Sequence, residues 1–182
     1  MRRRKHVSIV HKANVLKLGD GMFLDECRKC TKQFPGIELD EIIVDAMMAH
    51  VVRAPGRFDV IVTTNMYGDI LTDLTAELSG SIGLGGSLNA GEKHAMAQAA
   101  HGSAPDIAGK NLANPFSLIL SAALLLSRHG RQRSADSFLN AGATIEKAVE
   151  AAAKAGEITG DIGGKLGTRE TGAALAARLK GA

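Results

Sequence analysis

The chain has 182 residues, of which 45% are hydrophobic and 23% charged, so it is long enough for one domain or two small ones. The formal net charge is only +3 and acidic residues are interspersed throughout, which gives no support for a dedicated nucleic-acid surface. The longest apolar run, in residues 118–126, is far too short to span a membrane, and no signal peptide is visible. We therefore expect a cytoplasmic protein with no nucleic-acid and no membrane partner.

Hydrophobic periodicity divides the first part of the chain into alternating strands and helices, which indicates an α/β layer. We expect strands at residues 7–10, 38–44 and 59–63, and helices at residues 18–34, 46–53 and 65–79. The glycine-rich residues 79–91 form the expected boundary between two domains, residues 1–80 and 81–182. Further helices are expected at residues 115–129, 135–155 and 168–180, with Asn114 as the cap of the first.

Two local features could suggest other functions. The basic run at residues 2–5 could bind phosphate, but it is more typical of a solvated chain start. Cys27 and Cys30 form a lone Cys-x-x-Cys inside a helical pattern, which does not favour a zinc site or thioredoxin-like chemistry. We interpret both cysteines as reduced thiols of a cytosolic protein.

Asp69 and Asp73 stand four residues apart in the helix expected after the third strand, so both carboxylates project from one face. The same pattern places an apolar cluster on the far side, made of Ile70, Leu71, Leu74 and Leu78. Two such carboxylates could bind Mg²⁺ or Mn²⁺, which prefer carboxylate oxygens. Spacing alone favours a solvated acidic face, whereas a position at the end of a strand favours a site, and these residues by themselves leave both open.

Four motifs in this order resemble the isocitrate/isopropylmalate dehydrogenase family of metal-dependent β-decarboxylating dehydrogenases. They are His-Lys-Ala-Asn at 11–14, Val-Asp-Ala at 44–46, Asn-x-x-Gly-Asp-Ile-Leu-x-Asp at 65–73, and His-Gly-Ser-Ala-Pro-Asp-Ile-Ala-Gly at 101–109, which runs on to Asn114-Pro115. The resemblance implies the α/β fold of that family. Residues 1–80 would be part of its small, dimer-forming substrate and metal domain, and residues 81–182 the C-terminal part of its NAD-binding large domain.

The resemblance implies that Asp45, Asp69 and Asp73 hold Mg²⁺ or Mn²⁺, which would bind the hydroxyl and carboxylate of a malate-type substrate. Lys12 and Asp45 would be catalytic residues, with Lys12 helping to move the hydroxyl proton. In this family these two residues act in the site of the neighbouring subunit. We therefore expect a homodimer, or a dimer with a related chain, in which one chain alone has no complete site.

The implied cofactor is NAD. By resemblance, Asn14 would lie near the nicotinamide, and the remaining cofactor residues would be His101, Gly102, Ser103, Ala104, Asp106, Ile107 and Asn114. Asp106 resembles the acid that binds the adenosine ribose hydroxyls, and a carboxylate there would repel the 2′-phosphate of NADP. Taken alone, His101 would more often be a structural histidine.

The resemblance does not hold on the N-terminal side of Lys12, because only about eleven residues precede it, whereas family members have far more. The missing part would carry the substrate-gripping arginines and the acid tyrosine, so the fold is expected to be incomplete at its N-terminal side. We favour an enzyme segment for NAD-dependent oxidative decarboxylation of an isocitrate- or 3-isopropylmalate-class 2-hydroxy acid, inactive as an isolated chain. Homoisocitrate and tartrate stay open as substrates. The alternatives are a non-catalytic or regulatory subunit, an inactive fragment, and a binding module that uses the basic start.

Overall fold

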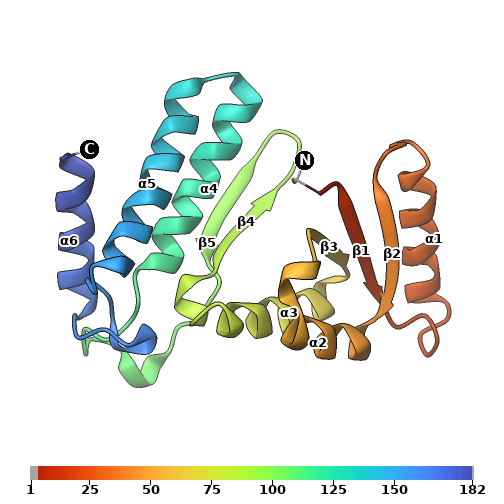
Figure 1. Ribbon diagram of the computed structural model, residues 1–182, viewed down its shortest axis with the longest axis horizontal. Coiled ribbons are helices and arrows are strands. Elements are labelled where there is room, and N and C mark those ends of the chain that lie inside the picture. Colours follow the sequence, from red (N-terminus) through yellow and green to blue (C-terminus); the bar gives the residue numbers. More distant parts are fainter. Residues whose placement is uncertain (1–3, 182) are drawn as a thin grey trace. The chain divides into compact units, whose positions relative to one another are not determined.

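The computed structural model describes residues 4–181, so the first two residues of the basic run at residues 2–5 lie outside the described residues (Figure 1). The chain divides into two compact units, Met1–Leu78 and Ser79–Ala182, which we describe one at a time. The first unit contains β1 (His6–His11), α1 (Gly19–Thr31), β2 (Glu38–Ile43), α2 (Val44–Arg53), a short 3-10 turn (Pro55–Arg57), β3 (Val60–Thr63) and α3 (Asn65–Leu78). This is the alternation that the sequence predicts.

The sheet of the first unit has the strand order β2-β1-β3, and both pairs are parallel. Because all of its strands run the same way, their carboxyl ends lie along one edge. Lys12 follows β1 at this edge, α2 begins directly after β2, and α3 begins two residues after β3. The threonine hydroxyl of Thr63 donates a hydrogen bond to the carbonyl of Val10 (2.8 Å) and so ties β3 to β1 there.

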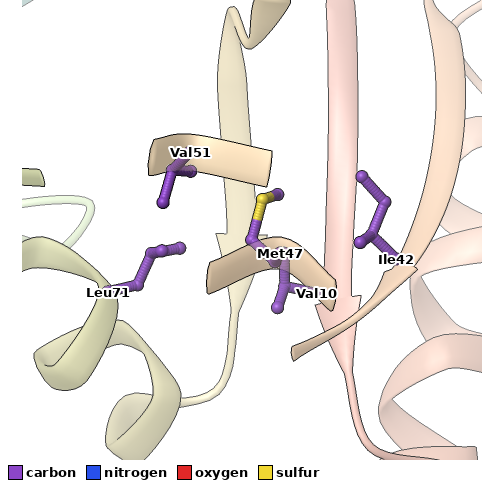
Figure 2. Packing of buried hydrophobic residues seen from close by; sticks show 5 residues of the cluster. All are labelled: Val10, Ile42, Met47, Val51 and Leu71. Carbon is purple, nitrogen blue, oxygen red and sulfur yellow. The ribbon is translucent and has the colours of Figure 1, made fainter. Parts of the chain in front are cut away.

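The hydrophobic core of the first unit joins the segments that lead into this edge. Val10, Ile42, Met47, Val51 and Leu71 form one buried cluster, with contributions from two strands and two helices. Figure 2 shows their side chains converging between the sheet and the two helices. Burying each such side chain contributes on the order of 1.5–3 kcal/mol, so the cluster fixes how α2 and α3 rotate about their axes.

The predicted apolar face of α3 is wrong in part. The structure buries Leu71 and Tyr67, whereas Ile70 and Leu78 are 54% and 45% exposed. On α1 the buried residues are Asp20 and Leu24, while the apolar Met22 is exposed. The reason on α3 is that it carries apolar residues on two faces, and only one of them packs inside this chain. On α1 the helix is turned so that Asp20 faces the backbone after β1.

The second unit consists of a hairpin and three main helices. Its elements are β4 (Gly86–Ala90), β5 (Ala95–Ala99), α4 (Phe116–Arg133), α5 (Asp136–Lys154) and α6 (Thr168–Lys180), with short 3-10 turns at Ile82–Leu84, Pro105–Ile107 and Gly160–Ile162. Its buried cluster is Phe116, Ala148, Val149, Ala152 and Leu175. Helices α4 and α5 pack closely, since a Cβ added at Gly142 would lie 2.4 Å from Ser127 Oγ. The apolar segment 118–126 is not fully covered, and Leu118 is 59% exposed.

The antiparallel hairpin of β4 and β5 is an element that the sequence analysis missed. Its strands consist mostly of small residues and contain no β-branched ones, so they lack the usual strand signal. Tertiary hydrogen bonds supply what propensity does not. Ser117 Oγ of α4 donates to the carbonyl of Gly85 (2.5 Å), and Ser121 Oγ accepts the N–H of Ser87 (2.9 Å) and contacts the carbonyl of Gln98 (2.6 Å).

Across residues 4–181, no helix combines the length and the apolar composition needed to cross a membrane.

Candidate functional site

The first group of candidate residues lies at the carboxyl edge of the three-stranded sheet. Lys12 directly follows β1, Asp45 is in the first turn of α2, and Asp69 and Asp73 lie on α3. Each of them is held by a core residue close by in the chain: Val10 before Lys12, Met47 after Asp45, and Leu71 between the two α3 aspartates. The burial of Leu71 leaves Asp69 and Asp73 exposed, which confirms that these carboxylates face away from the core.

Lys12 is the centre of the interactions at this edge. Its Nζ forms an ion pair with Asp45 Oδ1, and its backbone N–H donates to Asp20 Oδ2 at 2.6 Å. The Lys12 side chain is 26% exposed and that of Asp45 is 69% exposed. The pKa of Asp45 is lowered below its ordinary value. The main cause is the hydrogen bond from Lys12, and the second is a hydrogen bond from the backbone N–H of Asp45 itself. The carboxylate is therefore ionised at neutral pH, as a metal ligand must be.

Asp69 and Asp73 are the unengaged carboxylates of the edge. In the part of the chain that the structure describes, no hydrogen bond or ion pair is made by either carboxylate. The same residues 4–181 contain no group of three His, Cys, Asp or Glu side chains close enough to hold a metal ion. One chain therefore brings Lys12 and Asp45 together, but it does not assemble Asp45, Asp69 and Asp73 into one ligand set. Exposed carboxylates without partners nevertheless have the donor chemistry that Mg²⁺ and Mn²⁺ take.

The second group of candidate residues lines a pocket of about 540 Å³ within the second unit. Of the predicted cofactor residues, those that line it are His101, Gly102, Ser103, Ala104, Ile107 and Asn114. Asp106 is exposed in the 3-10 turn between them and is not part of the lining. Ala104 has φ 39°, a left-handed conformation that is uncommon for alanine and that sets the sharp turn before Pro105. Asn14 is exposed in the first unit, after β1.

The polar centre of this pocket is Asp161, which the sequence analysis missed. Its carboxylate accepts hydrogen bonds from Ser81 Oγ (2.6 Å), Asn114 Nδ2 (3.0 Å) and Thr159 Oγ1 (2.5 Å). Burial raises the pKa of Asp161, but these hydrogen bonds outweigh it and leave the pKa below the ordinary value. A Cβ at Gly83 would lie only 2.8 Å from Asp161 Oδ2, so glycine is needed beside it. Asp161 is thus a built-in negative charge at the wall of the pocket.

Asn114 serves the helix and the pocket together. Its Oδ1 accepts the N–H of Phe116, the first residue of α4, at 2.9 Å, although the N-cap position is Pro115 and not Asn114 as predicted. Its Nδ2 is then left to bind Asp161, so the start of α4 and the pocket wall share one side chain. His101, by contrast, is exposed, and its Nδ1 lies 2.9 Å from the carbonyl of Gly102.

Comparisons with known proteins agree with this picture. A family model described as isocitrate/isopropylmalate dehydrogenase matches residues 1–175. An isocitrate/homoisocitrate dehydrogenase of Thermus thermophilus is 49% identical over 149 residues, which cover 82% of this chain and 42% of that protein. A 3-isopropylmalate dehydrogenase of Methanothermobacter thermautotrophicus is 45% identical over 174 residues, 96% of this chain and 51% of that protein. The crystal structure of isocitrate dehydrogenase from Methylococcus capsulatus superimposes with a TM-score of 0.91 at 42% identity, over 98% of this chain and 51% of that one.

The parallel sheet and these matches place the chain in a class of α/β proteins named as dehydrogenases. The chain belongs to the isocitrate/isopropylmalate dehydrogenase family, which confirms the resemblance and the fold class inferred from the sequence. It spans about half the length of the relatives that it matches.

Proposed function

We propose that this chain supplies the metal-binding and cofactor-binding half of an NAD-dependent enzyme that oxidatively decarboxylates a malate-type 2-hydroxy acid. The observation that carries the proposal is the gathering of Lys12, Asp45, Asp69 and Asp73 at one edge of a parallel sheet. Substrates of the isocitrate or 3-isopropylmalate class fit this chemistry, since relatives named for both are similar to this chain.

Asp45, Asp69 and Asp73 would hold Mg²⁺ or Mn²⁺. When bound, the metal supplies a Lewis acid for the negative charge that develops on the substrate as CO2 leaves. The protein's own contribution is to present ionised, exposed carboxylates on helices whose rotation is fixed by Met47 and Leu71. Lys12 Nζ, held beside Asp45, would take part in moving the proton of the substrate hydroxyl.

A homodimer would complete the site. Apolar side chains of α2 and α3 are open to solvent, namely Val52 (58%), Met66 (60%), Ile70 (54%) and Leu78 (45%). Exposed apolar side chains gathered on two helices are typical of an interface, because covering them removes apolar area from water. A second copy seated there would bring its Lys12 and Asp45 to the Asp69 and Asp73 of the first, which fits the absence of a three-ligand group within residues 4–181 of one chain.

The pocket of the second unit would hold the adenosine end of NAD. Its small lining residues, such as Gly102 and Ser103, let a ligand approach the backbone. The nearby Asp106 carboxylate and the ionised Asp161 both oppose an additional phosphate on the ribose, which favours NAD over NADP. We also place the enzyme in the cytoplasm, which fits the free thiols of Cys27 and Cys30.

The alternative function is that of a regulatory subunit or inactive fragment of the same family. The observation that favours it is that, within residues 4–181, Lys12 pairs with Asp45 but no group of three His, Cys, Asp or Glu side chains could hold a metal ion. Such a subunit would lend Lys12 and Asp45 to the site of a longer partner. It differs from the favoured function in one measurable respect, because a complete form of the chain would oxidise no 2-hydroxy acid.

Mn²⁺ binding to the chain tests the proposed function. Binding is measured by electron paramagnetic resonance, as a decrease in the signal of the free ion. Asp69→Asn should weaken binding by about tenfold or more, since it replaces an ionised ligand oxygen with a neutral amide. Glu77→Gln, which removes an exposed acid from the same helix outside the proposed ligand set, should leave binding unchanged. Equal Mn²⁺ affinity in the wild type and the Asp69→Asn variant would contradict the ligand assignment.

A further inference from the structure

Asp20 is a buried acid that neither the metal ligands nor the cofactor pocket accounts for. It lies in the first turn of α1 and is 7% exposed, although an aspartate is rarely buried unless it is paired. Its Oδ2 accepts the backbone N–H of Lys12 at 2.6 Å. The carboxylate therefore reaches out of its own helix to the residue that follows β1.

The backbone of Lys12 is held from both sides. Asp20 takes its N–H, and its carbonyl accepts the N–H groups of Val15 and Leu16, each at 2.9 Å. The N–H of Asp20 in turn donates to the carbonyl of Leu16 at 3.1 Å, which closes the loop. With both backbone groups fixed, the direction in which the Lys12 side chain leaves the strand is set. That direction leads to the ion pair with Asp45.

We propose that Asp20 is a positioning residue, which fixes the backbone of Lys12 and so orients its side chain toward Asp45. The effect of Asp20 on catalysis rests on the role proposed above for Lys12. The hydrogen bond between Asp20 and the backbone of Lys12 does not depend on that role. An acid in the first turn of a helix also interacts favourably with the helix dipole. A dipole effect alone, however, would not alter the surroundings of Lys12.

The test is trace labelling of lysine amines in the 182-residue chain, with the product at each lysine counted by mass spectrometry. Asp20→Leu keeps similar bulk but has no acceptor, so the Lys12 amine should leave Asp45 and react about 2- to 10-fold faster, the range expected for loss of one hydrogen bond. Exposed Lys17 and Lys32 serve as references within the same molecule and should not change. Asp20→Asn retains an oxygen acceptor and should restore the wild-type ratio.

An unchanged ratio of Lys12 to Lys32 labelling in the folded Asp20→Leu chain would overturn the proposal. If that variant does not fold, hydrogen exchange of the Lys12 amide in the wild type tests the contact instead. Slow exchange is expected for an N–H bound to a buried carboxylate. Fast exchange would overturn the contact. In a complete enzyme, Asp20→Leu should lower kcat by about 100-fold, as expected for a misplaced reacting group. Altered labelling with unchanged kcat would uphold the positioning of Lys12 and overturn the role proposed for Lys12 in catalysis.

Discussion

The two units of this chain prepare their candidate sites in opposite ways. The first unit presents charged side chains at an exposed edge, and each is held by a buried apolar neighbour one or two residues away in the sequence, such as Val10 for Lys12 or Leu71 for Asp69. The second unit encloses a pocket with loops, and the carboxylate at the wall of this pocket, Asp161, is held by hydrogen bonds from distant segments. The first unit thus relies on local sequence and the second on tertiary structure.

This difference has a chemical meaning. Exposed carboxylates without protein partners, such as Asp69 and Asp73, are available to a ligand from outside. The carboxylate of Asp161 is occupied by Ser81, Asn114 and Thr159, so its function is to hold the pocket walls and to supply a fixed charge. We therefore expect changes in the first unit to affect metal binding and chemistry with little loss of stability. Changes at Asp161 should affect stability and cofactor binding together.

The largest effect is expected when the chain is assayed alone. We expect no measurable NAD reduction with isocitrate, 3-isopropylmalate, homoisocitrate or tartrate in the presence of Mn²⁺. The chain spans about half the length of its relatives, and misplacing a substrate by about 1 Å already costs about 100-fold in rate. Turnover at an ordinary enzymatic rate on any of these substrates would show that the described residues suffice for the reaction.

A smaller, combined effect is expected for Asp161→Ala. The substitution leaves three donors around an empty position, so the free energy of unfolding should fall by about 1–3 kcal/mol, and NAD binding should weaken with it. Urea unfolding and calorimetric titration with NAD measure the two effects. Asp106→Ala is the matched control, because it removes an exposed carboxylate near the same pocket and should not change stability.

The pH dependence of the free energy of unfolding sharpens the prediction for Asp161. The folded-state pKa of Asp161 is lowered, so its contribution to stability is fully present above the unfolded-state value of about 4 and is lost as the pH falls through the folded-state pKa. Asp161→Asn should therefore lose less stability than the wild type between about pH 4 and pH 2. Parallel acid unfolding curves for the two proteins would contradict the lowered pKa.

The smallest effect concerns the choice of dinucleotide. In a complete enzyme, changing Asp106 to Lys and Ile107 to Tyr should shift the preference toward NADP by about tenfold or more, because a repulsive charge is replaced by an attractive one. The ratio of kcat/KM for the two dinucleotides measures the shift. If the unaltered enzyme uses NADP as well as NAD, the ribose assignment of Asp106 is wrong.

The two units also differ in how much of their structure can be predicted from the sequence. Lys12, Asp45, Asp69 and Asp73 are recognised because each belongs to a short motif at or just after the end of a strand. The structure places Lys12 directly after β1, Asp45 in the first turn of α2, and Asp69 and Asp73 within α3. The predicted burial of Ile70 and Leu78 on α3 is wrong, since periodicity does not distinguish an apolar face that packs inside the chain from one that stays exposed.

The second unit is less accessible to sequence reasoning. Asp161 was missed because its partners Ser81 and Asn114 lie 80 and 47 residues away, and no local pattern brings them together. The hairpin of β4 and β5 was missed because its residues have little preference for strands, and serines of α4 hold it in place instead. The signal that could have led to Asp161 is the sequence Thr159-Gly160-Asp161, in which two side chains with matching hydrogen-bonding groups flank a glycine turn.

We propose that the acidic edge of the first unit is a metal site completed by a second copy of the chain. Mixing two variants that each bind Mn²⁺ only weakly on their own, Asp45→Asn and Asp69→Asn, tests this arrangement by electron paramagnetic resonance at an Mn²⁺ concentration that neither variant alone binds. In a shared site, the mixed dimer has one site in which both residues are intact, so random exchange of subunits should restore about one quarter of the wild-type Mn²⁺ sites. If each chain binds metal with its own three aspartates, the mixture will bind no more Mn²⁺ than either variant alone, and that result would contradict the account.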